Sequence, residues 1–308
     1  MRAHRVAMAC RFEVLLHGED AAWLGAASEA LEEADRLEAE LSVFRETSAL
    51  SRLNREAGGA AAAAGAELFA LLERCRALHA ATEGAFDITS TPLSRCWGFL
   101  RRQGRLPTSE AIDAARSLVG MSAVEMDAAA RTVRFSRAGM ELNLGAIGKG
   151  YALDRMAELL RARGVRDALL AAGGSSAVAL GGRGRGWTID VRSRRAKADR
   201  LARLVLRDGA LATSGAGEQF FEVGGRRHGH VIDPRTGWPA AGVLSVSVVS
   251  ADGAKSDALS TAFLVGGLGL ARRYCAAHPE TLVLLTPDDG AERPVVMGAF
   301  RGAQLEEA

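Results

Sequence analysis

The hydrophobic pattern of the chain is clearest between residues 140 and 164. Apolar and polar residues alternate from Met140 to Leu144, and this period of two predicts a short strand. From Tyr151 the apolar residues recur with a helical period, and Gly164 stands where a helix would end. The pattern therefore predicts a strand, a turn and a helix in this order.

The predicted turn combines glycines with a single lysine, Lys149. Glycine lets the backbone approach a ligand closely, so that its N–H groups can face an anion. A second buried strand, Ala168 to Ala172, ends on the pair Gly173 and Gly174. This succession of strands, helix and glycine turns is a scaffold of the kind that holds a phosphorylated ligand. The glycines of the first turn are Gly145, Gly148 and Gly150.

Lysine is rare in this chain, so the presence of Lys149 in the glycine turn is informative. Only three of the 39 basic residues are lysines. A compact ammonium and a planar guanidinium serve different purposes, so a lysine in a chain that otherwise uses arginine indicates a specific contact. Two interpretations are open: Lys149 neutralises a phosphate, or it is a solvated turn residue.

The N-terminal third predicts one strand and two long helices. The strand is expected over Val6 to Leu16. Apolar stripes predict helices over Glu19 to Leu41 and Glu67 to Thr82, each with a core-facing side. The polar stretch from Leu41 to Arg55 is interpreted as a connection, and Gly58 to Gly65 as a flexible loop.

The remainder of the chain predicts short strands, turns and two further helices. One helix is expected from Thr108 or Ser109 to Leu118, and Ser256 is expected to cap another that begins at Asp257. Residues 211–223, rich in small hydroxyl side chains, predict a turn. The expected strands are 133–135, 187–192, 204–207 and 242–250.

Composition is that of an ordinary globular protein. With 308 residues, 48% of them hydrophobic and 25% charged, the chain can bury a sizeable core. The net charge of +2 gives no reason to expect nucleic acid. The arginine-rich block from Arg183 to Arg195 is interleaved with glycine and lacks aromatic partners, so it is interpreted as an exposed loop.

The cysteines and the N-terminus bear on the compartment. The four cysteines, Cys10, Cys75, Cys96 and Cys275, show no metal-binding spacing and are expected to be buried free thiols in a reducing compartment. The first residues contain no apolar segment of signal-peptide type, so we expect a cytoplasmic protein. No apolar run is long enough for a membrane span.

Asp257 and Thr261 lie four residues apart and therefore share one helix face. An aspartate near a helix start also favours the helix dipole, whatever its function. A carboxylate and a hydroxyl one turn apart are nevertheless two hard oxygen ligands, suited to Mg²⁺ when phosphates supply the other ligands.

Two further segments leave alternatives open. Asp87 lies in a stretch rich in aromatic and hydroxyl residues, which is either an aromatic pocket beside an acid or a plain core loop. His230 and Asp233 precede a Pro-x-Thr-Gly sequence; they either orient a ligand or close a turn.

Six motifs in order resemble those of the ApbE family, the FAD:protein FMN transferases once described as thiamine biosynthesis lipoproteins. They cover roughly Met8 to Gly267. The resemblance implies an α+β fold of the ApbE type, related to T-folds, with antiparallel or mixed sheets and packed helices. It implies one domain, 1–308, in two lobes of approximately 1–139 and 140–308, with FAD between them and Mg²⁺ on its pyrophosphate. The motifs are L-N-L-G-A-I-G-K-G-Y-A-L-D, A-A-G-G, G-A-F-D-I-T-S-T-P-L with W-G-F, A-T-S-G, H-V-I-D-P-R-T-G-W-P and S-D-A-L-S-T-A.

Carried over residue by residue, the resemblance implies a site. The side chains of Asp257 and Thr261 and the backbone carbonyl of Ala146 match the ligands of Mg²⁺. Lys149, Asp257 and His230 are the implied catalytic residues. The positions implied around FAD are Met8, Ser42, Val43, Phe44, Asp87, Lys149, Gly173, Gly174, His230 and Ile232.

The chemistry implied is attack by a Thr or Ser hydroxyl of an acceptor protein on the FMN-side phosphorus of FAD, which gives phosphoester-linked FMN and AMP. The alternatives are an FAD pyrophosphatase that releases free FMN and AMP, and a flavin-binding protein without catalysis. No residue stands out as the general base. Members of the family are often exported, so the missing leader indicates either a cytoplasmic branch or an upstream start.

The chain departs from the family pattern in three places. M-A-C replaces M-G-T at the first flavin-side loop, and G-G-S-S replaces a glycine pair followed by Asp or Asn. G-E-Q-F-F replaces an aromatic residue followed by Glu and Arg. The Asp257 and Thr261 pair and Lys149 are retained.

Overall fold

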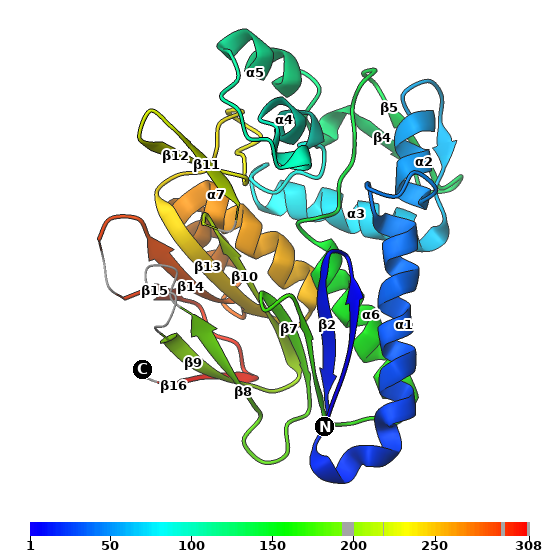
Figure 1. Ribbon diagram of the computed structural model, residues 1–308, viewed down its shortest axis with the longest axis vertical. Coiled ribbons are helices and arrows are strands. Elements are labelled where there is room, and N and C mark those ends of the chain that lie inside the picture. Colours follow the sequence, from blue (N-terminus) through cyan, green and yellow to red (C-terminus); the bar gives the residue numbers. More distant parts are fainter. Residues whose placement is uncertain (193–199, 218, 291–292, 307–308) are drawn as a thin grey trace.

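An eight-stranded sheet runs through the centre of the molecule (Figure 1). The computed structural model describes residues 1–192, 200–217, 219–290 and 293–306. Every neighbouring pair of strands in this sheet is antiparallel. The strands in spatial order are β1 (Arg2–Ala7), β2 (Cys10–Leu15), β6 (Ala168–Ala172), β7 (Ser176–Leu180), β10 (Gly209–Gly215), β13 (Val243–Ser250), β14 (Leu282–Pro287) and β15 (Val295–Met297).

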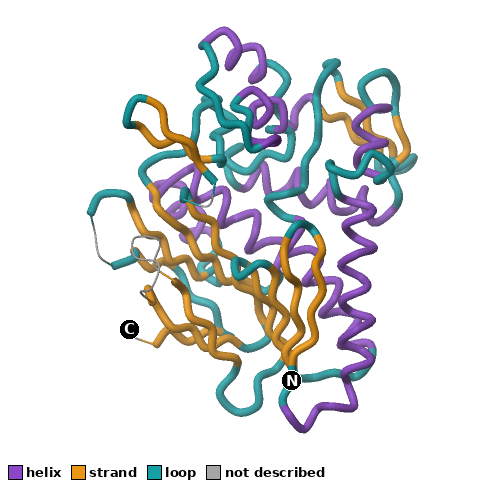
Figure 2. Tube along the Cα trace, viewed as in Figure 1, coloured by secondary structure: helices purple, strands orange, loops and turns teal. Residues whose placement is uncertain are grey.

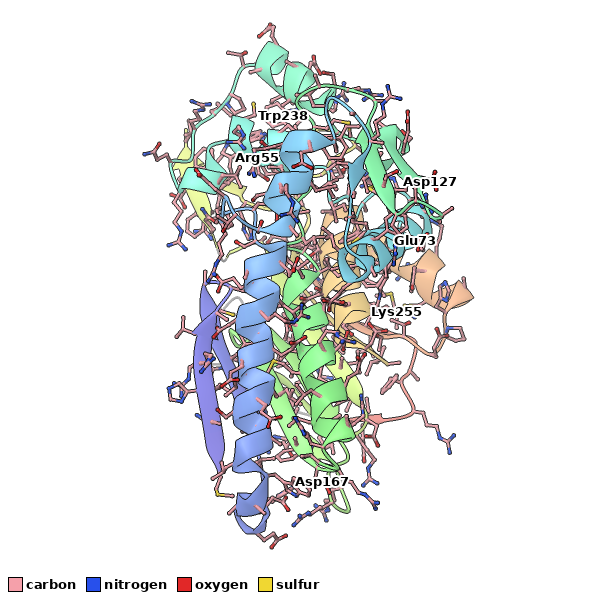
Figure 3. All side chains as sticks on the ribbon, turned by 90° about the vertical axis from the view of Figure 1, so that its right-hand side faces the viewer. Arg55, Glu73, Asp127, Asp167, Trp238 and Lys255 are labelled. Atoms are coloured by element: carbon pink, nitrogen blue, oxygen red, sulfur yellow. The ribbon has the colours of Figure 1, made fainter. Side chains whose placement is uncertain are left out.

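Three long helices cover one face of this sheet (Figure 2). They are α1 (Leu24–Leu41), α6 (Gly148–Ala162) and α7 (Gly253–Ala277), which is interrupted at Gly267. Helices α1 and α6 lie side by side along their length (Figure 3). Their apolar stripes are buried against the sheet because burying apolar surface is the main favourable term in folding.

A smaller antiparallel sheet covers the opposite face. It contains β8 (Trp187–Arg192), β9 (Arg200–Leu206) and β16 (Ala303–Glu306). Leu204 and Leu206 of this sheet pack with Leu211, Val249 and Leu284 of the large sheet in a second hydrophobic core. The central strands β7, β13 and β14 of the large sheet are thus buried on both faces, whereas the edge strands β1 and β15 are partly exposed.

The upper part of the molecule holds a fourth long helix, α3, and the shorter elements (Figure 1). A third small core joins Trp97, Phe99, Ile112 and Ile232. The helices here are α2 (Ala49–Glu56), α3 (Ala66–Ala81), α4 (Thr91–Cys96) and α5 (Ser109–Arg116), with 3₁₀ turns η2 (Phe99–Arg101) and η3 (Met121–Ala123). The strands are β3 (Ala62–Ala63), β4 (Val124–Asp127), β5 (Thr132–Phe135), β11 (Phe220–Val223) and β12 (Arg226–Gly229).

The two long N-terminal helices are confirmed, the first as the 3₁₀ turn η1 (Gly18–Trp23) followed by α1, the second as α3. The single strand expected over Val6 to Leu16 is wrong: it is the hairpin of β1 and β2, which turns at Met8 and Ala9. The polar stretch after Leu41 contains helix α2, and the loop expected at 58–65 contains β3.

The central motif also differs from its prediction. Residues Met140 to Leu144 belong to no strand. The side chain of Asn54 instead pairs with the backbone of Leu142, accepting from its N–H at 2.8 Å and donating to its carbonyl at 2.9 Å. Helix α6 starts at Gly148 rather than Tyr151, so Lys149 lies in its first turn, and Gly164 follows its end as predicted.

Three predictions in the C-terminal half need correction. Residues 211–223 form parts of β10 and β11 rather than a turn; Glu218 lies outside the described residues. Helix α7 is capped by Asp252, not Ser256, because the Asp252 side chain accepts from the Lys255 N–H. The block Arg183 to Arg195 includes strand β8, and its residues 193–195 fall in the part not described.

The remaining expectations concern thiols, membranes and lobes. All four cysteines are free, but only Cys75 and Cys275 are buried, whereas Cys10 and Cys96 are half-buried. Within the described ranges, no helix combines the length and apolar character that a membrane crossing needs. The two-lobe division stays a prediction; β1, β2 and α1 share one core with α6 and β6 across its boundary.

Candidate active site

Helices α6 and α7 touch through their backbones at Gly150 and Gly253. A Cβ atom on Gly150 would lie 2.1 Å from the Gly253 carbonyl oxygen, and one on Gly253 would lie 2.6 Å from the Gly150 carbonyl oxygen. No side chain larger than hydrogen fits at either position without moving a backbone. Gly150, predicted to bring its N–H to an anion, therefore serves first to let the two helices meet.

Asp257 of α7 lies at this contact and is 7% exposed. Its Oδ2 accepts from the Gly150 N–H at 2.6 Å, and its Oδ1 accepts from the Ser176 hydroxyl at 2.8 Å. Burial raises the pKa of the Asp257 carboxyl, and the nearby charge of Lys149 works against this rise. The structure thus surrounds one buried carboxylate with donors from two elements, α6 and β7.

Thr261 follows Asp257 by one turn, on the same helix face as predicted. Its hydroxyl lies 3.2 Å from the hydroxyl of Ser214 on β10, and Ser214 is also 2.8 Å from the Ser260 hydroxyl. The end of β10 and the first turns of α7 therefore present several hydroxyl oxygens beside the carboxylate.

Ala146 precedes the N-cap of α6, Ile147, so its carbonyl lies outside the hydrogen bonds of the helix. The Gly150 N–H belongs to the first turn, where N–H groups have no partner within the helix, and it donates to Asp257. A carboxylate, a hydroxyl and a carbonyl are the hard oxygen ligands that Mg²⁺ takes.

The donor set therefore fits a magnesium ion that is partly held by phosphate oxygens. In the part of the chain that the structure describes, no three His, Cys, Asp or Glu side chains are arranged so that they could hold a metal ion by themselves. A cation here would consequently have few protein ligands, as is usual for Mg²⁺ bound to phosphate-bearing substrates.

Lys149 reaches the turn between β6 and β7. Its Nζ donates to the Ser175 hydroxyl at 2.6 Å. Gly173 and Gly174, which precede Ser175, have φ angles of 59° and 70°, a left-handed conformation that favours glycine. The predicted lysine and the predicted glycine pair are thus brought together.

The hairpin of β1 and β2 adjoins the same turn. A Cβ atom on Gly173 would lie 3.1 Å from Cβ and 3.4 Å from Sγ of Cys10. Burial raises the pKa of the Cys10 thiol, and the charge of Lys149 lowers it. Met8, the other hairpin residue implied around FAD, has a φ of 48° at the tip.

His230 belongs to a second group beneath the β11 and β12 hairpin. It helps to line a cavity of about 490 Å³. Its Nδ1 lies 3.2 Å from the Gln219 carbonyl oxygen; because a carbonyl only accepts, Nδ1 carries a proton in this contact. The cavity is lined by Phe99, Arg102, Gly104, Gln219, Phe220, Phe221 and His230.

Ile232 and Asp233 stabilise the segment that follows His230. The Ile232 side chain is 6% exposed and lies in the small upper core, so any ligand contact there would use its backbone. Asp233 accepts from the Arg235 N–H at 2.9 Å, and the Trp97 indole donates to the Gly237 carbonyl at 2.9 Å. Of the two interpretations, turn closure accounts for Asp233.

Asp87 is occupied by its own loop. Its Oδ1 accepts from the Thr89 N–H at 2.8 Å and from the Thr89 hydroxyl at 2.6 Å. Its Oδ2 lies 3.4 Å from Nδ1 of His79. The Thr89 hydroxyl in turn accepts from the Gly120 N–H at 2.7 Å, so Asp87 orders the loop that leads into α4.

Ser42, Val43 and Phe44 form the turn between α1 and α2. The Ser42 carbonyl accepts from the Ser48 hydroxyl at 2.7 Å, and the Ser42 hydroxyl accepts from the Phe44 N–H at 3.2 Å. The Phe44 ring is 74% exposed. This turn presents an aromatic side chain to solvent.

Sequence reasoning missed residues that complete the first group. Ser176 follows the G-G-S motif and Ser214 lies in A-T-S-G, yet neither motif indicates which side chain it meets. Asp154, one turn after Gly150, accepts from the N–H groups of Gly253 and Ala254. Its spacing from Gly150 was the available signal, since residues four apart share a helix face. Burial raises the pKa of Asp154 to about 7, and the two N–H groups lower it.

The chain is similar in sequence to known proteins. The model of the ApbE family matches residues 8–285. The chain is 36% identical over 244 residues to the FAD:protein FMN transferase of Treponema pallidum, across 74% of this chain and 67% of that protein. It is 40% identical over 226 residues to the FAD:protein FMN transferase of Rhodobacter capsulatus, across 72% of this chain but only 42% of that protein.

Solved structures agree with these sequence matches. The ApbE protein of Thermotoga maritima superposes with a TM-score of 0.86 at 29% identity, covering 97% of this chain and 96% of that one. The flavinyl transferase ApbE of Pseudomonas stutzeri, in its apo form, gives a TM-score of 0.82 at 27% identity and covers 97% and 94% of the two chains. The mixed arrangement of helices and antiparallel sheets is therefore the expected α+β fold.

Proposed function

The chain belongs to the ApbE family, and from this premise we propose that it transfers FMN from FAD to a Thr or Ser hydroxyl of an acceptor protein and releases AMP. The name FAD:protein FMN transferase, shared by the curated relatives, supports transfer over flavin binding without catalysis. The observation in this molecule that carries the proposal is the buried Asp257 carboxylate with Lys149 close to it, at the contact of α6 and α7.

Asp257, Thr261 and the Ala146 carbonyl would hold the magnesium ion. When bound, Mg²⁺ supplies positive charge that stabilises the pyrophosphate as its P–O–P bond breaks. Asp257 is prepared for this role because its carboxylate is already fixed by the Gly150 and Ser176 donors. A ligand held in one orientation loses little freedom on binding.

Lys149 would also neutralise charge on the FAD pyrophosphate. Its ammonium donates to Ser175, a neutral hydroxyl, so its charge is not cancelled by that partner. The left-handed turn at Gly173 and Gly174 brings backbone close to it without a Cβ. A compact cation beside the reacting phosphate stabilises charge that develops in the transition state.

The transfer step exchanges one P–O bond for another. The acceptor hydroxyl oxygen bonds to the FMN-side phosphorus, the bond from that phosphorus to the bridging oxygen breaks, and AMP leaves with the bridging oxygen. The hydroxyl proton must go to a base. We assign this role to the imidazole of His230, one of the implied catalytic residues; with Nδ1 donating to the Gln219 carbonyl, the neutral ring would take the proton at Nε2.

The experiment that tests this proposal uses three peptides that are identical except for Thr, Ser or Ala at the acceptor position. Each is incubated with the protein, FAD and Mg²⁺ and analysed by mass spectrometry, with EDTA in a parallel series. We expect the Thr and Ser peptides to gain the FMN mass as AMP appears, and the Ala peptide to remain unmodified. Modification of the Ala peptide, or undiminished turnover in EDTA, would contradict the proposal.

A further inference from the structure

The first turn of α7 is tied to α6 by hydrogen bonds that run in both directions. From α6, the Asp154 carboxylate accepts from the N–H of Gly253 at 2.6 Å and from the N–H of Ala254 at 2.9 Å. From α7, the Asp257 carboxylate accepts from the N–H of Gly150 at 2.6 Å. Each helix therefore supplies a carboxylate to backbone N–H groups of the other.

The spacing of these ties fixes how the helices cross. Gly150 and Asp154 are four residues apart in α6, and Gly253 and Asp257 are four apart in α7. Along each helix axis, the two ties therefore lie about 6 Å apart, slightly more than one helical turn. The glycine backbones touch between them. Two ties one turn apart, with a steric contact between, resist both sliding and rotation of α7 against α6.

Asp154 differs from the other carboxylate at this helix end. The first N–H groups of a helix lack partners within it. Asp252, which belongs to the same chain segment as α7, caps the helix through the Lys255 N–H at 2.8 Å and pairs with Arg74. Asp154 instead comes from α6, so it joins the two helices, whereas Asp252 does not contact α6 through any bond among the described residues.

We infer that Asp154 is a positioning residue for the cation site. It contacts none of the three oxygen groups that the proposed function gives to the metal, but it fixes the turn of α7 from which Asp257 and Thr261 project relative to the turn of α6 that follows Ala146. Among the described residues, its loss would leave the Gly150 bond as the remaining hydrogen bond between α6 and α7, alongside the packing of the two helices. The inference rests on the proposed function for the identity of those ligands.

The test compares Asp154→Ala with Asp252→Ala in the full chain, at pH 8 and with FAD bound. Both variants remove a carboxylate that accepts from N–H groups in the first turn of α7. Only Asp154→Ala also removes hydrogen bonds between α7 and α6. The affinity for Mn²⁺ is read from the electron paramagnetic resonance signal of the free ion. We expect Asp154→Ala to weaken Mn²⁺ binding about tenfold, the lower range for loss of a residue that supports metal ligands. Asp252→Ala should change it by less than about twofold, because it leaves the ties between α6 and α7 in place.

A second readout separates positioning from general destabilisation. If Asp154 positions the ligands, AMP release by Asp154→Ala should need more Mg²⁺ for half-maximal rate and approach the wild-type rate at saturating Mg²⁺. A purely structural role would lower the rate at every Mg²⁺ concentration. Should Asp154→Ala fail to fold, Asp154→Asn, which keeps one acceptor oxygen, should weaken Mn²⁺ binding by a smaller factor.

The outcomes distinguish this inference from the proposed function. Equal Mn²⁺ affinities in Asp154→Ala and wild type, equal losses in Asp154→Ala and Asp252→Ala, or no Mn²⁺ binding by the wild type would overturn the inference. If the wild type binds Mn²⁺ and the variants differ as expected, but no AMP forms, the positioning role stands and the transferase function fails.

Discussion

The backbone N–H of Gly150 donates to Oδ2 of Asp257 at 2.6 Å, across the contact between α6 and α7. Gly150 lies in the first turn of α6, where N–H groups have no partner within the helix. This hydrogen bond therefore satisfies the N–H and fixes the carboxylate in one orientation. The proposed cation site is a consequence of how closely the two helices meet.

Gly150→Ala should damage both the helix contact and the site. The new methyl group would meet the Gly253 carbonyl and push the helices apart. We expect a loss of about 1 to 3 kcal/mol in the free energy of unfolding, typical of an overpacked core, and weaker Mg²⁺-dependent activity. Gly148→Ala is the matched control, since its Cβ meets nothing within 4 Å. Urea unfolding measures the free energy of unfolding of both variants. Equal values for the two would contradict the close contact between the helices.

Asp257→Asn should remove activity while keeping the fold. The amide oxygen can accept from Gly150, and the amide nitrogen can donate to Ser176, whose hydroxyl reverses its role. The free energy of unfolding should stay within about 1 kcal/mol of the wild type because these bonds survive. AMP release at the wild-type rate would show that the carboxylate holds no cation.

Lys149→Ala should weaken FAD but not riboflavin, which lacks phosphates. The expected loss for FAD is about 1.5 to 3 kcal/mol, the range for a hydrogen bond to a charged group. Lys255→Ala is the control: Lys255, in the first turn of α7 (labelled in Figure 3), forms an ion pair with Glu280, and the proposed function gives it no contact with FAD. Fluorescence titration measures both ligands. Equal losses for FAD and riboflavin would mean that Lys149 supports the turn instead of the phosphate.

Labelling of Cys10 can test whether FAD binds next to the hairpin of β1 and β2. Burial raises the pKa of its thiol, so less thiolate is present at neutral pH and alkylation by iodoacetamide should accelerate as the pH rises toward the thiol pKa. Because Cys10 lies against Gly173, bound FAD should slow this labelling. Mass spectrometry of the labelled peptide, with Cys10→Ala to identify the site, follows the rate. An identical rate with saturating FAD would place the hairpin away from the ligand.

Long, regular patterns in the sequence predicted their elements well. Helix α1 buries Ala27, Leu31, Ala34 and Leu41 on one face, and this periodicity is visible in the sequence because it needs no distant partner. The hairpin turn at Met8 and Ala9 could not be predicted in the same way. Both residues have positive φ angles without the glycine or asparagine that usually marks such a turn.

Distant partners explain the other differences. Met140, Leu142 and Leu144 alternate because all three are buried, but the backbone of Leu142 pairs with the side chain of Asn54 and not with a strand. Likewise, Asp154 and Gly253 are 99 residues apart in the chain. Motifs indicated Lys149, Asp257 and Thr261 individually; the contacts that orient them depend on how α6 meets α7.

The most direct test of transfer is a reaction in water enriched in ¹⁸O, with FAD and Mg²⁺, run with and without an acceptor peptide. If an acceptor hydroxyl attacks the phosphorus, AMP and FMN-modified peptide should form in equal amounts, and neither the linked FMN nor AMP should gain ¹⁸O. Hydrolysis would instead release free FMN or AMP that carries one ¹⁸O atom. Free ¹⁸O-labelled FMN that accumulates at the same rate with and without the peptide, while the peptide stays unmodified, would contradict the transferase function.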